Sequence, residues 1–175
     1  MIHLYTGEGK GKTTAAIGLA VRAAGRGFGV CFAQFMKGND TGELYVLSSL
    51  PQMKILRSDK NFGFYSSMSE ADKAELTKIH NRILDRLLEE AEGETCRMII
   101  MDELTWAVKW RLLAPEKLKT LLDRGRAGST GEIELVITGR GADDFLEDAA
   151  DYITRMECVR HPYEKGIAAR KGIEF

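Results

Sequence analysis

The sequence has 175 residues and a mass of 19.5 kDa, the size of one compact domain rather than of two domains with separate cores. It is 44% hydrophobic and 29% charged, close to the averages for globular proteins, which excludes disordered and fibrous chains. Its 25 basic and 26 acidic residues leave a net charge of −1, so no global field favours nucleic acid or an acidic membrane surface.

The sequence contains no apolar run near the ~20 residues that span a bilayer, and Met1 leads into a short apolar segment rather than a signal sequence. We therefore expect no membrane association and a cytoplasmic location. Cys31, Cys96 and Cys158 are odd in number, far apart, and form no Cys-x-x-Cys pair. We expect them to be reduced and mostly buried thiols.

Apolar runs and helical spacings alternate along the chain. In chain order we expect a strand at residues 2–5, a helix with its apolar spacing over 15–23, a strand at 30–36, a short helix at 43–50, a strand at 53–56, a loop at 58–68, a long helix from 69 to 93, a strand at 98–101, a helix at 115–122, a strand at 133–137, a short acidic helix, a strand at 152–159 and a basic tail. This alternation predicts a doubly wound, mostly parallel α/β sheet flanked by helices. With no internal repeat or linker, residues 1–175 form one predicted domain.

The long helix has the clearest boundaries. Ser69 precedes it and Asp72 follows three residues later, a variant of the capping box. Its apolar residues recur at helical spacing and predict one buried face, and Gly93 ends it.

A glycine-rich segment lies between the first strand and the first helix: Thr6-Gly7-Glu8-Gly9-Lys10-Gly11-Lys12-Thr13-Thr14. This context is typical of a P-loop, in which backbone N–H groups surround phosphate oxygens and the helix start adds its positive end. We expect Lys12 to neutralise the phosphate chain, Thr13 to bind Mg²⁺ and Thr14 to bond a neighbouring phosphate oxygen. The segment departs from the usual pattern at Thr6, with Gly7 one place later. The alternative is an ordinary turn with solvated lysines.

Charged residues also follow three other predicted strands. Asp102 and Glu103 end the fourth strand, Lys37 follows the second and Arg140 follows the fifth. Ligands bind at the carboxyl edge of an open parallel sheet, and Mg²⁺ prefers one or two carboxylates together with phosphate oxygens. We expect Asp102 and Glu103 to serve the metal, and Lys37 and Arg140 to contact phosphate. Structural acidic residues and solvated loop cations are the alternatives.

Other polar and aromatic residues give weaker signals. Trp106 and Trp110 are four residues apart and would share one helix face, either in packing or against a large planar ligand. His3, His80 and His161 have neither metal-ligand spacing nor a nucleophile partner. We interpret all three histidines as structural.

Five segments together resemble a known family. They are TGEGKGKTTAAIGLAVRAAGRG, QFMKG after the second strand, MDELTWAV, ITGRG after the fifth strand, and the closing HPYEKGIAARKGIEF. In this order they resemble the P-loop type of ATP:corrinoid adenosyltransferase, also called cob(I)yrinic acid a,c-diamide adenosyltransferase. The resemblance extends over nearly the whole chain, and it implies a P-loop NTPase-like fold.

The resemblance implies transfer of the 5′-deoxyadenosyl group of ATP to the cobalt of a reduced corrinoid, in adenosylcobalamin biosynthesis or salvage. Triphosphate is then the leaving group, ATP the co-substrate and Mg²⁺ the cofactor. Lys12, the loop N–H groups and Mg²⁺ would stabilise the departing charge, and no general base is required. We also expect a homodimer and an electron donor such as a flavoprotein.

The resemblance further implies that aromatic residues before the long helix crowd the lower face of the corrinoid, so that cobalt loses its axial ligand and is easier to reduce. The family pattern resembles Gly-Phe-x-Trp, whereas this chain has Gly63-Phe64-Tyr65-Ser66. Phe64 takes the catalytic position of the Phe. No residue matches the Trp, for which Phe62 or Tyr65 would substitute. Simple anchoring of the loop is the alternative.

Two other functions fit the binding motifs. A P-loop kinase or NTPase would move the γ-phosphoryl group with the same residues. A nucleotide-dependent regulatory module would change partner contacts through the loop at 58–68 and leave a corrinoid unchanged.

Overall fold

The computed structural model describes residues 1–126 and 133–174. Its strands are β1 (Ile2–Thr6), β2 (Gly29–Gln34), β3 (Met53–Leu56), β4 (Cys96–Asp102), β5 (Glu134–Thr138) and β6 (Tyr152–Arg155). Its helices are α1 (Lys12–Ala24), α2 (Gly42–Leu47), α3 (Glu70–Glu92), α4 (Leu104–Lys109), α5 (Pro115–Gly125) and α6 (Asp144–Ala149), with short 3₁₀ turns η1 (Tyr65–Ser67) and η2 (Pro162–Lys165).

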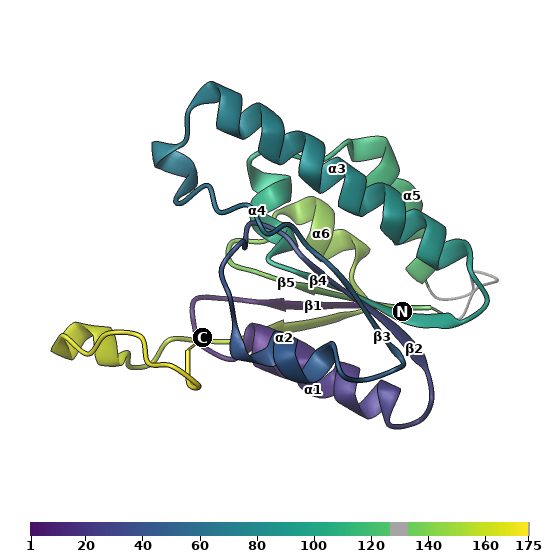
Figure 1. Ribbon diagram of the computed structural model, residues 1–175, viewed down its shortest axis with the longest axis horizontal. Coiled ribbons are helices and arrows are strands. Elements are labelled where there is room, and N and C mark those ends of the chain that lie inside the picture. Colours follow the sequence, from purple (N-terminus) through teal and green to yellow (C-terminus); the bar gives the residue numbers. More distant parts are fainter. Residues whose placement is uncertain (127–132, 175) are drawn as a thin grey trace.

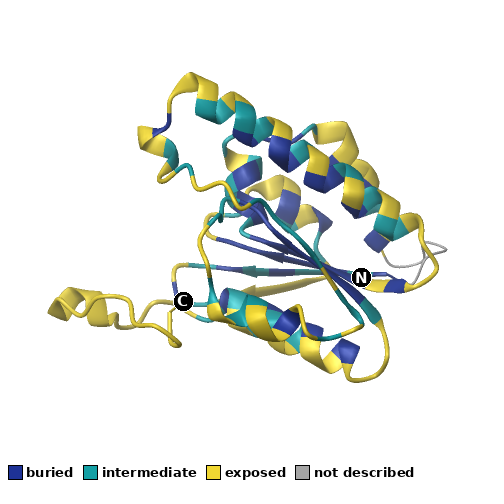
Figure 2. Cartoon of the chain, viewed as in Figure 1, coloured by how far each residue is buried: buried dark blue, intermediate teal, exposed yellow. Residues whose placement is uncertain are grey.

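The strands form one six-stranded sheet in the order β3-β2-β4-β5-β1-β6, and every pair in it is parallel. Helices α1 and α2 cover one face, and α3 to α6 cover the other (Figure 1). Figure 2 shows the buried residues concentrated in the strands and on the helix faces toward them. Because helices cover both faces, the central strands are apolar on both sides. The predicted doubly wound α/β fold is confirmed.

Two strands are shorter than the sequence predicts. The second ends at Gln34 instead of Met36, because Met36 has a left-handed backbone with φ 59° that ends the extended chain. The sixth ends at Arg155 instead of Val159, because Met156 turns onto the P-loop: its N–H bonds Thr6 O, and its carbonyl accepts from the N–H of Gly9.

Two helix boundaries also differ. Helix α2 ends at Leu47, three residues before the predicted limit, whereas α5 continues to Gly125. The boundaries of α3 agree with the prediction. Ser69 and Asp72 form the capping box, with Asp72 N donating to Ser69 Oγ at 3.1 Å and Ser69 N donating to Asp72 Oδ2 at 3.3 Å. Their bonds satisfy backbone donors at the helix start.

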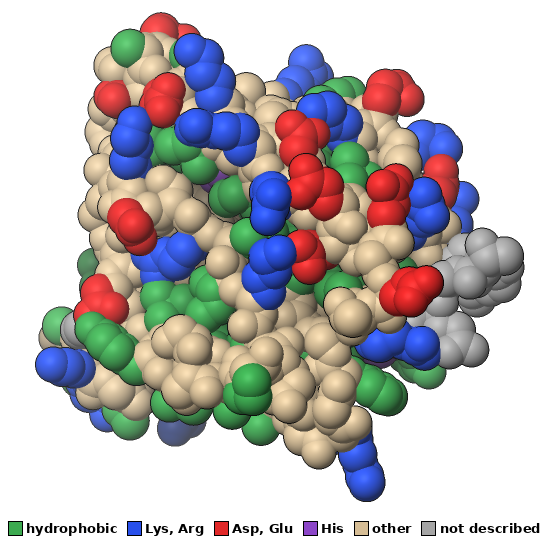
Figure 3. All heavy atoms as spheres, turned by 45° about the vertical axis from the view of Figure 1, so that its right-hand side comes forward, with side chains coloured by type: hydrophobic (Ala, Val, Ile, Leu, Met, Phe, Trp, Pro, Cys, Tyr) green, Lys and Arg blue, Asp and Glu red, His purple; other side chains and the backbone are tan. Residues whose placement is uncertain are grey.

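The surface mixes charges of both signs. Figure 3 shows basic and acidic side chains interspersed on the face it presents, and ion pairs such as Lys119–Asp123 at 2.7 Å join the two kinds.

In the described part of the chain, no helix combines the length and hydropathy of a membrane span. Cys31 and Cys96 are buried free thiols as expected, whereas Cys158 is exposed.

His80 lies in the larger core, on the inner face of α3, with 1% of its surface exposed. Its ring meets that of Phe35 edge-on, with the centroids 5.2 Å apart. Burial lowers the pKa of His80 to about 4. The imidazole is therefore neutral in the folded protein at pH values where the unfolded chain begins to bind a proton.

We predict that His80 makes the fold sensitive to acid. Below pH ~6.5 the imidazole of the unfolded chain binds a proton, whereas the imidazole of the folded protein stays neutral until about pH 4. The free energy of unfolding therefore falls as the pH decreases through this window. The loss is on the order of 3 kcal/mol between these two pKa values. Urea unfolding of the wild type and His80→Gln at pH 7 and pH 4 measures it. The wild type should lose more stability than the variant, and equal losses would contradict the assignment.

Candidate functional site

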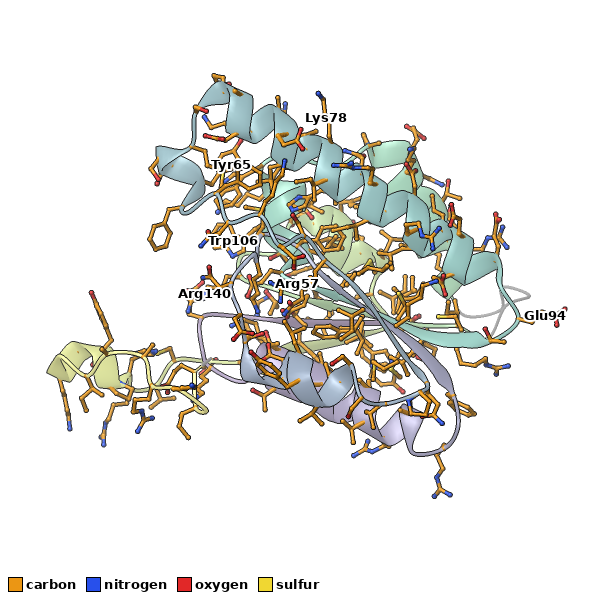
Figure 4. All side chains as sticks on the ribbon, in the orientation of Figure 1. Arg57, Tyr65, Lys78, Glu94, Trp106 and Arg140 are labelled. Atoms are coloured by element: carbon orange, nitrogen blue, oxygen red, sulfur yellow. The ribbon has the colours of Figure 1, made fainter. Side chains whose placement is uncertain are left out.

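The site lies at the carboxyl edge of the sheet, where several loops follow parallel strands. The P-loop follows β1 and Lys37 follows β2. Asp102 ends β4, Glu103 comes directly after it, and Arg140 follows β5. Figure 4 shows Arg57, Tyr65, Trp106 and Arg140 at this end of the molecule, with Glu94 at the opposite end. All residues that the sequence predicts for phosphate or metal therefore belong to segments that meet at one edge.

Asp102 is the centre of this site and is completely buried. Its Oδ1 accepts from the hydroxyl groups of Thr13 and Thr138, each at 2.7 Å. Its Oδ2 lies 2.6 Å from the ammonium of Lys37. A buried carboxylate is unfavourable unless it is paired and hydrogen-bonded. These contacts join the ends of β2, β4 and β5 to the start of α1.

Two neighbouring charges respond to this burial. Burial acts to lower the pKa of Lys37, but the adjacent Asp102 carboxylate outweighs it and the pKa is raised. Lys37 therefore stays a cation. Burial raises the pKa of Glu103 and the charge of Asp102 adds to this, while Lys37, Lys12 and Arg140 oppose it. Glu103 also has a left-handed backbone, with φ 59°, and its N–H donates to the hydroxyl of Thr138 at 3.0 Å.

The P-loop folds around the ammonium of Lys12. Its Nζ donates to the carbonyls of Gly7 at 2.6 Å and Gly9 at 2.7 Å. Burial lowers the pKa of Lys12, and the nearby charge of Arg140 acts in the same direction. An anion in the loop would offset both effects, because it favours the charged form of the lysine.

The chain beyond β6 lies directly against the P-loop. The N–H of Gly9 donates to the carbonyl of Met156 at 2.7 Å. A Cβ on Gly7 would lie 2.4 Å from the Met156 carbonyl, and one on Gly9 would lie 2.5 Å from that of Glu157. Glycine is therefore required here for close approach of two backbones, and at Gly7 also for φ 97°.

The remaining predicted phosphate contacts differ in their surroundings. Arg140 pairs with Glu8 of the P-loop at 3.2 Å. Lys10 points elsewhere, to Glu174 in the tail at 3.0 Å. Thr14 is exposed on α1, and Thr6 is buried at the end of β1. Gly11, with φ 115°, is the N-cap of α1.

Sequence reasoning missed three residues of this site. Thr138 was not selected, although a hydroxyl directly before the Gly139-Arg140 pair at a strand end is a usable signal. Met156 and Glu157 contact the P-loop through backbone atoms, so their side chains give no signal.

The loop before α3 is anchored by stacked rings. Tyr65 stacks on Trp110, with centroids 4.1 Å apart and planes at 6°, and Trp110 stacks on Trp106 at 4.9 Å. Phe62 is partly buried against the larger core. Phe64, in contrast, is 84% exposed. The ring at Tyr65 is thus engaged in packing, while Phe64 is free to contact a ligand.

This arrangement is suited to a polyphosphate and a hard cation. Lys12, Lys37 and Arg140 supply positive charge, and the P-loop supplies backbone donors. Thr13 and Asp102 offer oxygen atoms side by side, 2.7 Å apart. Mg²⁺ binds with few carboxylates and completes its shell with phosphate and water, so these donors fit it. Across residues 1–126 and 133–174 there is no group of three or more His, Cys, Asp or Glu that would form a closed metal site.

Solved structures share the fold. EssC (ATPases 2 and 3) from Geobacillus thermodenitrificans superimposes with a TM-score of 0.52 at 16% sequence identity. The match covers 98% of this chain and 34% of that longer chain. At this identity the similarity concerns the fold alone.

Curated relatives match this chain over its whole length and over most of their own. The corrinoid adenosyltransferase CobA of Salmonella typhimurium is 32% identical over 181 residues, covering 100% of this chain and 85% of that protein. Corrinoid adenosyltransferases of Sinorhizobium sp and Escherichia coli K12 are 29% and 30% identical, and this chain spans 80% and 85% of their lengths. The model of the family "ATP:corrinoid adenosyltransferase BtuR/CobO/CobP" matches residues 1–175. The chain therefore belongs to the ATP:corrinoid adenosyltransferase family.

Proposed function

We propose that this protein transfers the 5′-deoxyadenosyl group of ATP to the cobalt of a reduced corrinoid and releases triphosphate. The proposal rests on the hydrogen bond by which Thr13, at the end of the P-loop, contacts Asp102. The chain also belongs to the family that catalyses this reaction. A kinase or NTPase would use the same phosphate contacts. Family membership favours the transfer to cobalt over that alternative.

The reaction is a displacement at the ribose C5′ atom. Cobalt(I) donates an electron pair to form the Co–C bond, the C5′–O bond breaks, and its electrons leave with triphosphate. The step moves no proton, so it needs no general base. The residues must instead bind the triphosphate and stabilise the charge that develops on it. Lys12 and the P-loop N–H groups fill that role, with Lys37 and Arg140 at the same edge.

We assign the metal site to Thr13, Asp102 and Glu103. The Thr13 hydroxyl, in the first turn of α1, lies 2.7 Å from a carboxylate oxygen of Asp102. When bound there, Mg²⁺ neutralises phosphate charge and so makes triphosphate a better leaving group. Lys37 pairs with Oδ2 of Asp102, and its flexible side chain would also reach a triphosphate bound at this edge.

We place the corrinoid beside the loop at 58–68. Phe64 projects from it with 84% of its surface exposed, so its ring is accessible to a ligand. There the ring excludes an axial ligand from the cobalt, and an external donor such as a flavoprotein supplies the electron. Tyr65 stacks on Trp110 and so anchors this loop.

We further propose that residues 1–175 act as one nucleotide-binding domain and that two copies form a homodimer. Strand β6 is an edge strand, and its four residues are exposed, including Tyr152 at 51% and Ile153 at 46%. An uncovered edge strand with apolar side chains is a surface on which a second copy can pack.

The function is tested by incubating the purified protein with ATP, Mg²⁺ and a chemically reduced corrinoid while recording the visible spectrum. Conversion to the adenosylated corrinoid supports the proposal. An unchanged corrinoid spectrum, with ATP bound or hydrolysed, would favour a kinase, an NTPase or a regulatory module.

We predict that Lys12→Ala lowers the rate of adenosyl transfer on the order of a hundredfold to a thousandfold, because it removes charge from the leaving group. Lys10→Ala is the matched control, since Lys10 pairs with Glu174 instead of facing the loop interior. Turnover at saturating ATP and the melting temperature are measured for both variants. A larger loss in Lys10→Ala would reverse the assignment of the two lysines.

We predict that Asp102→Asn and Glu103→Gln each raise the Mg²⁺ concentration for half-maximal rate by roughly tenfold or more. Asp102→Asn should also destabilise the fold, because it leaves Lys37 without its partner in a buried place. Glu103→Gln is the cleaner test. If neither substitution alters the Mg²⁺ dependence, the acidic pair is structural.

We predict that Phe64→Ala slows adenosylation when cobalt must be reduced in the site, and has much less effect when cobalt(I) is supplied. The exposed ring contributes little packing, so the unfolding free energy should change by less than about 0.5 kcal/mol. Rates are compared in the two assays. Equal losses in both, accompanied by destabilisation, would make Phe64 a structural residue.

A further inference from the structure

The function proposed above assigns no role to the buried imidazole of His80. Its Nε2 lies 3.2 Å from the backbone nitrogen of Met36. Because an N–H donates there, Nε2 must be the unprotonated nitrogen and Nδ1 must carry the proton. Nδ1 has no hydrogen-bond partner within the described residues. The ring is thus kept in the core for one polar contact, the one to Met36.

Met36 needs such support because of its backbone. It has a left-handed conformation with φ 59°, which costs a non-glycine residue about 1–2 kcal/mol. The conformation ends β2 and turns the chain, so that Lys37 comes back over the strand end to Asp102. The hydrogen bond that His80 accepts therefore constrains the N–H of Met36, the residue that makes this turn.

The residue after the turn is the one that pairs with Asp102. Lys37 Nζ is 2.6 Å from Oδ2 of that completely buried carboxylate. The pair depends on good geometry, because the Asp102 carboxylate has lost its water and Lys37 is half-buried. His80, Met36 and Lys37 also line the same small pocket, so the three residues lie close together. A displaced turn would therefore displace the Lys37 ammonium.

We propose that His80 is a positioning residue for the triphosphate site, acting through the Met36 turn on Lys37. The inference rests on the proposed function, in which Lys37 contacts the triphosphate. His80 touches neither ATP nor the metal. It fixes the conformation from which Lys37 reaches both Asp102 and a bound triphosphate.

The two amides that resemble parts of an imidazole provide a matched test. Glutamine can place an acceptor oxygen where Nε2 lies, whereas asparagine reaches only the position of Nδ1. His80→Gln should thus keep the bond to Met36, and His80→Asn should lose it. Loss of one hydrogen bond worth about 1 kcal/mol corresponds to a dissociation constant for MgATP that is about fivefold higher. His3→Asn, in β1 and bonded to Glu134, is the control that should bind as the wild type does.

Calorimetric titration with MgATP measures these constants, together with Lys37→Ala and the double variant Lys37→Ala/His80→Asn. If His80 acts through Lys37, the double variant binds no more weakly than Lys37→Ala alone. Additive losses would overturn the inference, as would a His80→Asn protein that melts earlier but binds MgATP normally. Normal MgATP binding by Lys37→Ala would also overturn it.

A second measurement needs no folded variant at position 80. In ¹⁵N spectra of the wild type, the His80 ring should have an unprotonated Nε2 that accepts a hydrogen bond, and its signals should shift when MgATP saturates the site. Unchanged signals at saturation would contradict the coupling. Failure of the proposed function gives a different result: MgATP binding with the same coupling, and no adenosylation of a reduced corrinoid.

Discussion

The buried carboxylate of Asp102 is the interaction on which the site depends. It has lost its water completely, and it is compensated by two hydroxyl donors and one ammonium. These partners come from three other segments: the start of α1, the turn after β2 and the end of β5. One desolvated charge thereby fixes the relative positions of four loops. Removal of any partner leaves the others with unsatisfied groups, so geometry and stability are coupled here.

The P-loop is constrained from its other side by backbone alone. Met156 and Glu157 lie so close to Gly7 and Gly9 that a side chain at either glycine position would collide with their backbone. The C-terminal segment thus helps to shape a phosphate-binding loop almost 150 residues earlier in the chain, as the ladder from β1 to β6 requires. The Lys12 ammonium is held inside the loop by two of its carbonyls.

Most of the fold and the core of the site could be predicted because the signals are local. Each strand of the parallel sheet is an apolar run, and the charged residues of the site come shortly after the ends of these runs. The topology therefore brings these residues to one edge of the sheet. The capping box at Ser69 and Asp72 is likewise contained in four residues. For these features, neighbouring residues determine the outcome.

The features that could not be predicted depend on distant contacts. Met36 leaves the strand pattern because its N–H bonds an imidazole 44 residues away. Tyr65 packs on Trp110, 45 positions further along the chain, a contact that neither local sequence encodes. The last strand stops at Arg155 because the next residue bonds the P-loop, and an apolar run cannot encode where its partner lies. The pairing of Lys10 with Glu174 is of the same kind.

The central claim is that this site breaks the bond between the ribose C5′ atom and the triphosphate, and leaves the phosphate chain whole. The most direct measurement is ³¹P NMR of the phosphate products during turnover with ATP and a reduced corrinoid. We expect one intact inorganic triphosphate for each corrinoid that is adenosylated. Accumulation of ADP and phosphate, in proportion to the ATP consumed, would contradict the claim.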